Sequence, residues 1–597
     1  MKKILAVLLV AVMCFAFVAA CAADETPPPP PPAPADTPAP AATPAPAPEP
    51  DAEPSARQLL AEYHGLPWEP HMEDWEPITF IVWDRNPGTA PAADNPVLNI
   101  VEEITNVRIQ FEFLVGDLET ALGTMLAAGG EALPHAGFFG GEAAAAIDSG
   151  HFIPIGDLIE AHAPNLRAHF APWWELMRHT DGLIYTAEIF GTPTGEQHAS
   201  VMSFNGTAFY MQMSVVDFHG RPPADLNEYF QFMYDYMQAN PYTEAGVPIR
   251  GFEILTEGWR RFCIDNPPMF LQGHGNWGGA VNLDGIRPDS QPTPADRWMN
   301  DWNREYYEIL NYWFHRGLIQ ADTLALSHEE YLAHIATGAV LGMSDQHWNF
   351  NAGQDPLRAA DDWHRTMVSF DFTNPGVTPN YIAARSFTGS NGLNISTSNP
   401  DPIRFAQFMD WVIQENTQRF LAWGIEGENW HMENGVITRP AEQRVLQAES
   451  RWNYDNLGTM LRNLFPKMQG TFSDGNATDP DESPTEQFAG HSEFEREFFT
   501  RHGILHRNGF MRSVPYNAPV FYPFWGMSMA DGSPEHIANQ RITDVNTEWL
   551  ARLVIAPEGQ FDSLWEQYQA ALAEIDQTPI FDFFRSEGER MLAAVGG

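Results

Sequence analysis

The sequence predicts an α/β fold, because strand and helix patterns alternate along the first part of its folded body. Residues 78–83 (ITFIVW) form an apolar run typical of a buried strand, and residues 107–113 (VRIQFEF) alternate as a second strand. Residues 136–139 (AGFF) form a third, shorter strand. Residues 94–105 and 118–128, which lie between these strands, have the periodicity of helices. This order predicts a parallel sheet whose strands are joined by crossover helices.

The remainder of the chain is long enough for more than one core. It has 597 residues in all, and about 540 remain after the N-terminal signal and linker, which suits two or three lobes. Amphipathic helices dominate its middle and its end. We expect helices at residues 225–238, 297–314, 327–337, 402–415, 547–553 and 561–575, and strands at 340–343 and 393–396.

The first 20 residues have the features of a bacterial export signal. Lys2 and Lys3 precede an almost unbroken apolar run over residues 4–18, which is short for a membrane span. Small residues then lead to Cys21 (VAAC), and this segment resembles a lipobox. We expect a diacylglycerol on the Cys21 thiol, with palmitate-type chains, and attachment to the outer face of the cell membrane. The alternative is an ordinary secretory signal in which Cys21 is incidental.

Residues 21–70 read as a linker between this anchor and the body. Between residues 27 and 50 nearly every residue is proline, alanine, threonine or an acid. Such a segment has nothing to bury and favours extended polyproline II, at about 3.1 Å per residue. A disordered tail is the alternative, but the position directly after a lipid site favours a tether.

Charge and cysteine content exclude several classes of protein. The formal net charge is −45, and Lys467 is the only lysine outside the signal. So acidic a surface repels nucleic acid and anionic lipid, so we expect no nucleic-acid partner and membrane attachment through the lipid alone. Of three cysteines, only Cys263 remains for the folded body, so no intramolecular disulfide can form there.

Five short segments, in order along the chain, resemble motifs of extracellular solute-binding protein family 1, the substrate-binding lipoproteins of ABC importers that include alginate-binding members. Each is weak alone, and their order and spacing carry the resemblance, which covers residues 78 to 575. The segments are residues 150–159 (GHFIPIGDLI) with 163–165 (APN), 181–185 (DGLIY), 315–322 (HRGLIQAD), 337–343 (TGAVLGM) and 423–430 (WGIEGENW).

The resemblance implies a type II periplasmic-binding-protein fold, in which two α/β lobes enclose a ligand cleft and are joined by hinge crossings. Such proteins close on a solute, present it to permease subunits and perform no chemistry. We therefore expect a monomer without catalytic residues or cofactors. The implied organisation places the first part of lobe I at residues 71–200, the first part of lobe II at 201–385, and the return segments at 386–597.

Residues 240–248 (NPYTEAGVP) depart from the family pattern. Family members often carry an acidic calcium loop at this point, whereas this stretch is shorter and has lost most of its oxygen ligands. Calcium takes six to eight oxygen ligands. We therefore predict no calcium or other metal at this loop.

The candidate ligand contacts combine aromatic rings with polar side chains. Ligands bind beyond the carboxyl ends of parallel strands, where the family cleft also lies, and tryptophan faces suit the C–H faces of sugars. Most of the 19 tryptophans must be core, and each polar side chain is as readily an ordinary surface residue. The aromatic candidates are Trp83, Trp277, Trp348, Phe521 and Trp525, and the polar candidates are Asp84, Glu142, Glu196, Asn276, Gln346 and Arg385.

These features favour a substrate-binding lipoprotein that takes up an oligosaccharide. A peptide or another organic solute is the alternative ligand. A secreted glycoside hydrolase would also be rich in tryptophan and carboxylates, but it needs a pair of carboxylates across a cleft. A sensor or adhesion protein with the same binding fold is a third reading.

Replacing the lipidated cysteine tests the anchor. We expect Cys21→Ser to release an intact, ligand-competent protein into the medium, because two or three acyl chains supply the whole membrane attachment. Fractionation of cells followed by immunoblotting measures the effect. Retention of the variant in the membrane fraction would contradict the anchor.

Overall fold

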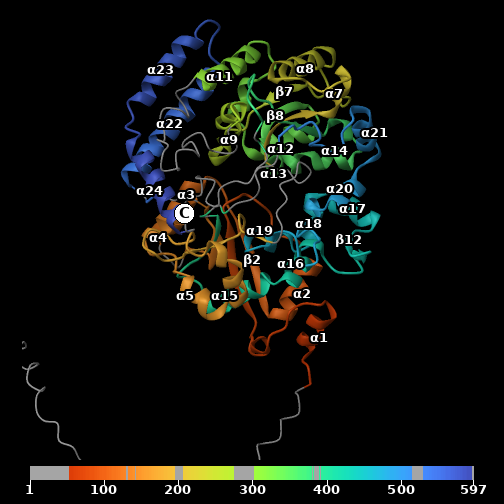
Figure 1. The fold of residues 1–597 in the computed structure, drawn as a ribbon, viewed down its shortest axis with the longest axis vertical. Coiled ribbons are helices and arrows are strands. Elements are labelled where there is room, and N and C mark those ends of the chain that lie inside the picture. The colour runs from red at the N-terminus through yellow and green to blue at the C-terminus, as the bar shows by residue number, and fades with distance from the viewer. Residues whose placement is uncertain are drawn as a thin grey trace, which may run out of the picture. The chain divides into compact units, whose positions relative to one another are not determined.

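Two separate mixed sheets, each with its own helices, organise residues 54–597, which form one compact unit of the chain (Figure 1). The first sheet has the strand order β2-β1-β3-β10-β4 and the second has the order β7-β8-β6-β9. The computed structural model describes residues 53–128, 132–140, 143–194, 206–273, 301–379, 381, 387, 389, 391–513, 529–530 and 532–594.

The first sheet confirms the predicted order of strands and helices. Its central strand β1 (Ile78–Asp84) pairs in parallel with β2 (Val107–Phe113) and with β3 (Ala136–Phe138). The connections are α2 (Pro96–Thr105) and α3 (Leu118–Ala128), within two residues of the expected bounds. The two crossover helices could therefore be predicted from the local periodicity of the sequence alone.

Two antiparallel strands complete the first sheet. β10 (Gly392–Ile395) lies between β3 and β4 (Thr186–Glu188) and runs antiparallel to both. The chain therefore leaves this sheet after β4 and returns only at β10. The lobe boundaries expected at residues 200 and 385 fall outside the described residues.

The second sheet is built within this excursion. Its strands are β6 (Thr207–Gln212), β7 (Arg250–Glu253), β8 (Val340–Gln346) and β9 (Met367–Phe370). β8 runs parallel to β7 and antiparallel to β6. It extends three residues beyond the predicted 340–343, because its polar end is buried and hydrogen-bonded.

Helices cover both sheets. In the second group, α8 contacts β7 and α7 contacts β6, and in the first, α15 packs on α5 and α6 (Figure 1). α15 ends three residues before the predicted residue 415. The bounds are α4 Ala143–Asp148, α5 Gly156–His162, α6 Pro164–His169, α7 Met213–His219, α8 Leu226–Ala239, α10 Pro267–Leu271, α11 Asp301–Phe314, α12 His328–Ala336, α14 Asp355–Ala359 and α15 Pro402–Val412.

Short helices lie before β1, and short helices and strands lie between β10 and the last helices. Between β10 and the last helices lies a run of short helices with one small antiparallel sheet and one further short strand, which pairs with a strand that precedes the second sheet. The bounds are α1 Ala56–Tyr63, η1 Pro70–Asp74, β5 Pro193–Thr194, α16 Glu415–Trp423, β11 His431–Glu433, β12 Val436–Thr438, α17 Ala441–Gln447, α18 Ser450–Asn456, α19 Thr459–Leu464, β13 Gln469–Gly470, α20 Pro484–Gly490 and α21 Glu493–His502.

Three helices close the chain: α22 (Pro534–Val554), α23 (Phe561–Ala573) and α24 (Thr578–Ala594). The expected helix at 547–553 is thus only the last third of α22. Its start was missed because the first two turns are polar, although Ser533 caps them. Asn311 of α11 donates to the carbonyl oxygens of Val554, the last residue of α22, and of Ala556, at 3.0 and 2.8 Å, and so fixes the end of α22 on α11.

Two further expectations concern the body as a whole. Among the described helices, none is both long enough and apolar enough to cross a bilayer. Cys263 is a buried free thiol.

Substituting Gly342 tests the packing of β8. A Cβ at this position would lie 2.6 Å from the Tyr229 hydroxyl and 2.8 Å from the Tyr210 carbonyl oxygen. We expect Gly342→Ala to lower the free energy of unfolding by about 1–3 kcal/mol through overpacking, seen as a lower thermal midpoint. Gly123→Ala in α3 is the control, because its Cβ would meet open space and a helical alanine is favourable. Equal midpoints for the two variants would refute this packing.

Candidate functional site

A cluster of three aromatic rings, Trp259, Phe262 and Trp348, lies beside the carboxyl end of β8, and we call it the aromatic platform. The two indole rings stack with their centroids 5.8 Å apart and their planes 15° from parallel. Phe262 contacts both, at 5.9 and 5.8 Å. Trp259 is 39% exposed and Trp348 is 46% exposed. Adjacent large apolar rings that remain exposed are typical of a surface that binds a ligand or a partner.

Local sequence explains why these rings point outward. Trp348 belongs to α13 (His347–Phe350), which starts directly where β8 ends. Trp259 belongs to the short helix η5 (Gly258–Arg261), and Phe262 begins α9 (Phe262–Asp265). Gly258 adopts a φ of 51°, a conformation that glycine takes readily, and this turn presents the next residue at the surface.

Two arginines face the Trp259 ring. The Arg260 guanidinium carbon lies 4.6 Å from its centroid, and that of Arg85 lies 5.8 Å away. Arg85 follows β1 in the first sheet, where its backbone N–H donates to Phe138 and its Nη1 donates to the Phe139 carbonyl oxygen. A residue at the end of the first sheet thus meets the platform of the second. The two lobes are in contact through a cation–π pair.

Asp84 lies next to this contact. Its Oδ1 accepts hydrogen bonds from the backbone N–H and the Nδ2 of Asn86, at 2.9 and 2.8 Å. Burial raises the pKa of the Asp84 carboxyl above its ordinary value, while these hydrogen bonds and the nearby Arg85 and Arg260 oppose the rise. The carboxylate therefore offers an acceptor oxygen at the edge of the platform.

A second carboxylate, Asp345, lies beneath the platform and is fully buried. Its oxygens accept from the Tyr331 hydroxyl at 2.8 Å, from Asn349 Nδ2 at 3.0 Å, and from the Cys263 thiol at 3.3 Å. Burial raises the pKa of Asp345 to about 6, and the hydrogen bonds limit the rise. Asp345 is enclosed, so its carboxylate is not part of the exposed surface of the platform.

The C-terminal helices hold the platform from another side. Arg261, adjacent to the platform, donates to the Asp265 carboxylate at 2.9 Å and to the Thr543 carbonyl oxygen of α22 at 3.2 Å. Its Nη1 also contacts the Thr547 hydroxyl. The segment that carries Trp259 is therefore braced by α22.

The structure places four of the predicted ligand contacts. Trp348 is a member of the platform, and Gln346 accepts a hydrogen bond from its indole nitrogen at 2.7 Å. Asp84 lies at the edge of the platform, within electrostatic reach of Arg260. Trp83 is only 2% exposed and packs 5.0 Å from Phe139, so we assign its ring to the core and leave it out of the site.

The other predicted contacts lie outside the described residues and stay predictions. Together with the lipidation site Cys21, they are Glu142, Glu196, Asn276, Trp277, Arg385, Phe521 and Trp525.

Sequence reasoning missed Trp259, Phe262, Arg85 and Arg260. Only a weak signal was available: Trp259 stands between a glycine and two arginines, in a stretch with neither helical nor alternating periodicity. Such a tryptophan has no helix face on which to be buried.

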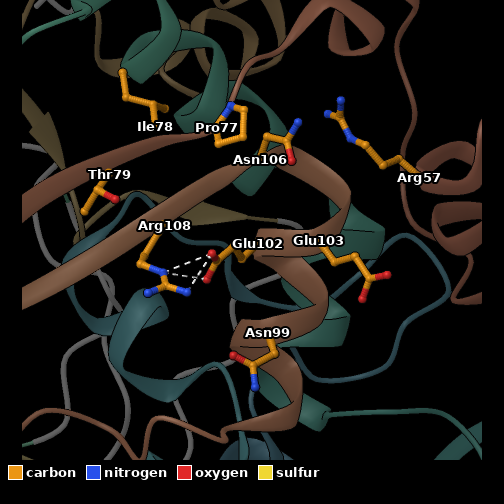
Figure 2. A pocket seen from close by; sticks show the side chains of 9 residues that line it. All are labelled: Arg57, Pro77, Ile78, Thr79, Asn99, Glu102, Glu103, Asn106 and Arg108. Atoms are coloured by element: carbon orange, nitrogen blue, oxygen red, sulfur yellow. Dashed lines mark hydrogen bonds and ion pairs between the residues drawn. The ribbon is translucent and has the colours of Figure 1, made fainter.

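A separate open hollow of about 650 Å³ lies at the amino ends of β1 and β2 (Figure 2). Ile78 and Thr79 begin β1 there, whereas Asp84 and the platform lie beyond its other end. Arg108, on its wall, is held by Glu102 at 2.9 Å. This hollow therefore lies at the amino ends of the strands, whereas the candidate site lies at the carboxyl end of β1.

The loop at residues 240–248 closes on itself through hydrogen bonds between Thr243 and Val247. Its single carboxylate, Glu244, pairs with Arg365 at 2.6 Å. Within the described residues, no group of three or more histidine, cysteine or acidic side chains is placed to hold a metal. The expectation that calcium is not bound here stays a prediction.

The sequence matches no protein-family model and no curated protein. Solved structures do match. A calcium-free alginate-binding protein is 15% identical with a TM-score of 0.56, over 86% of this chain and 98% of that one. This is the two-lobed fold of periplasmic solute-binding proteins. A substrate-binding protein of a Streptococcus pneumoniae ABC transporter, solved in complex with kestose, is 14% identical with a TM-score of 0.56, over 86% of this chain and 100% of that one. A Bifidobacterium longum infantis solute-binding protein that binds human milk oligosaccharides (HMO) is 13% identical with a TM-score of 0.55, over 87% of this chain and 99% of that one.

Titration of Asp345 should make stability depend on pH. Its folded pKa of about 6 lies above its ordinary 3.8, so the folded state holds this proton more tightly and loses stability as pH rises from 4 to 6. The full effect is about 3 kcal/mol at most. We expect the thermal midpoint of the wild type to fall, relative to that of Asp345→Asn, between pH 4 and pH 7. A constant difference between the two midpoints over this range would contradict it.

Proposed function

We propose that this chain is the extracellular substrate-binding lipoprotein of an ABC importer, which captures an oligosaccharide and delivers it to permease subunits. The aromatic platform is the observation that carries the proposal. Two stacked, half-exposed indoles offer flat apolar faces to sugar rings, and Asp84 supplies an acceptor for hydroxyl groups beside them. The platform lies at the carboxyl end of β8, where ligands of this kind of sheet bind.

The fold supports the same proposal. Similar structures include proteins that bind alginate, kestose and human milk oligosaccharides. We propose that the chain belongs to solute-binding protein family 1, acts as a monomer, and is attached to the membrane only by lipid at Cys21. The net charge of −45 is consistent with no further membrane contact.

We also propose that the chain binds its sugar without hydrolysing it. A glycoside hydrolase needs one carboxyl group as an acid and a second as base or nucleophile. The carboxylates described at the platform are each engaged within the chain: Asp84 by Asn86, Glu257 by the backbone N–H of His328, and Asp345 by buried donors. This arrangement favours a surface that binds a sugar over an active site in which carboxyl groups act as acid and base.

Alanine substitution of the platform rings tests the ligand class. We expect kestose or another short oligosaccharide to raise the thermal midpoint of the protein, since binding stabilises the folded state. Trp259→Ala and Trp348→Ala should each weaken that sugar at least tenfold, about 1.4 kcal/mol or more, by titration calorimetry.

Tyr312→Ala is the matched control. Tyr312 is similarly exposed, at 48%, and also has an arginine over its ring, but it lies on α11 outside the platform. Its removal should leave affinity unchanged. A thermal shift with a peptide pool and none with sugars would replace the sugar proposal by a peptide ligand, and turnover of chromogenic glycosides would replace it by an enzyme.

A further inference from the structure

We propose that Asp345 is a positioning residue that sets the orientation of both tryptophans of the aromatic platform. The claim that this orientation serves a ligand rests on the function proposed above. The geometric claim does not, because it concerns contacts within the chain.

The first connection runs from Asp345 to Trp259. Asn349 Nδ2 donates to both carboxylate oxygens of Asp345, at 3.0 and 3.1 Å. The Oδ1 of Asn349 in turn accepts from Arg260 Nε at 3.2 Å. The guanidinium of Arg260 then lies 4.6 Å from the centroid of Trp259. A bonded amide and a cation–π contact thus separate the carboxylate from the first ring.

The second connection runs from Asp345 to Trp348. The backbone N–H of Gln346 donates to Asp345 Oδ1 at 2.6 Å, and this bond orients the residue at the end of β8. The side-chain oxygen of Gln346 accepts the indole N–H of Trp348 at 2.7 Å. The second ring is therefore tied to the same carboxylate oxygen through one residue.

The remaining contacts hold the carboxylate itself in place. The hydroxyl of Tyr331 in α12 and the thiol of Cys263 in α9 donate to it from two other elements. A buried charge that receives several hydrogen bonds has a fixed position, because moving it would leave donors unpaired in a medium of low polarity. Asp345 is thus a rigid centre from which two linkages lead to the exposed rings.

A purely structural role would be the simpler explanation, since a buried carboxylate must be satisfied by whatever donors surround it. That role requires no link to the surface. Here two of the donating residues, Asn349 and Gln346, each make a second contact that leads to the platform, to Arg260 and to Trp348 respectively. The convergence of both rings on one carboxylate favours positioning.

Other titratable groups lie near Asp345, so loss of the titration in Asp345→Asn, and not its midpoint, assigns the titration to this carboxyl group. Burial holds the thiol of Cys263 and the hydroxyl of Tyr331 at pKa values well above their ordinary ones. The elements packed against Asp345 also carry Asp265 of α9, His334 of α12 and Glu253 of β7, together with Arg260. Burial raises the pKa of Tyr210 and lowers the pKa values of two histidines, His328 and His347.

The test observes the indole N–H resonances of protein labelled with ¹⁵N-tryptophan, with no ligand present. Loss of a resonance in Trp348→Phe and in Trp259→Phe assigns the two rings. In the wild type we expect the Trp348 resonance to shift with pH around a midpoint near 6. In Asp345→Asn, both resonances should move and the pH-dependent shift of Trp348 should disappear.

Asp371→Asn is the matched control. Asp371 is another buried aspartate of the second lobe with a raised pKa, but its oxygen accepts from Ser513 and Arg512 rather than from residues that lead to the platform. This variant should leave both resonances and the titration unchanged. Identical platform resonances in wild type and Asp345→Asn, or an equal effect of Asp371→Asn, would overturn the proposal.

A second variant covers the case in which Asp345→Asn fails to fold. Asn349→Ala breaks the linkage to Trp259 and also removes one donor from the Asp345 carboxylate. The Trp259 resonance should therefore move, while Trp348 should keep a pH titration whose midpoint is raised, because the lost hydrogen bond favoured the charged form. Loss of that titration in Asn349→Ala would overturn the two-linkage arrangement.

A ligand arm separates the two proposals. If kestose binds the wild type, Asp345→Asn should weaken it at least tenfold and Asp371→Asn should not. Equal kestose affinity in wild type and Asp345→Asn would overturn the functional role of positioning. Failure of every sugar to bind would instead count against the proposed function, while the resonances still decide the geometry.

Discussion

The pairing of β10 between β3 and β4 is the constraint on which the rest of the structure depends. The chain must build the whole second sheet between Glu188 and Gly392 before this strand can close the first. The seat of β10 is tight, since a Cβ on Gly392 would lie 2.1 Å from the Ala187 carbonyl oxygen. The chain therefore crosses between the lobes after β4 and again before β10, and Arg85 at the carboxyl end of β1 meets Trp259 beside the carboxyl end of β8.

That juxtaposition assembles a site from parts that are far apart in sequence. The first sheet contributes Asp84 and Arg85, and the second contributes the platform with Asp345 beneath it. The exposed rings lie above a buried, fully bonded layer, so their orientation depends on groups that no ligand reaches. Rings that are held in place before binding lose little conformational freedom when a ligand binds.

The first sheet could be predicted because each of its early strands has its own local pattern. β6, β7 and β9 could not, since short strands buried on both faces have no alternation to separate them from helices. For the candidate site, Trp348 and Asp84 could be singled out from the sequence because Asp84 ends a recognisable strand and Trp348 lies just after one. Trp259 lies in a turn without periodicity, and its meeting with Arg85 depends on tertiary structure alone.

The segment that leads into β1 determines which lobe would carry a force applied to the chain before it. Among the described residues, the segment before β1 is hydrogen-bonded only to the first lobe. Trp411 donates to the Pro67 carbonyl oxygen at 2.9 Å, and Asn416 donates to that of Gly65 at the same distance. Arg57 is fastened likewise to the Ile104 carbonyl oxygen. A force applied to the chain before residue 54 would therefore act first on these hydrogen bonds and on the first sheet, and would reach the second lobe only through the first.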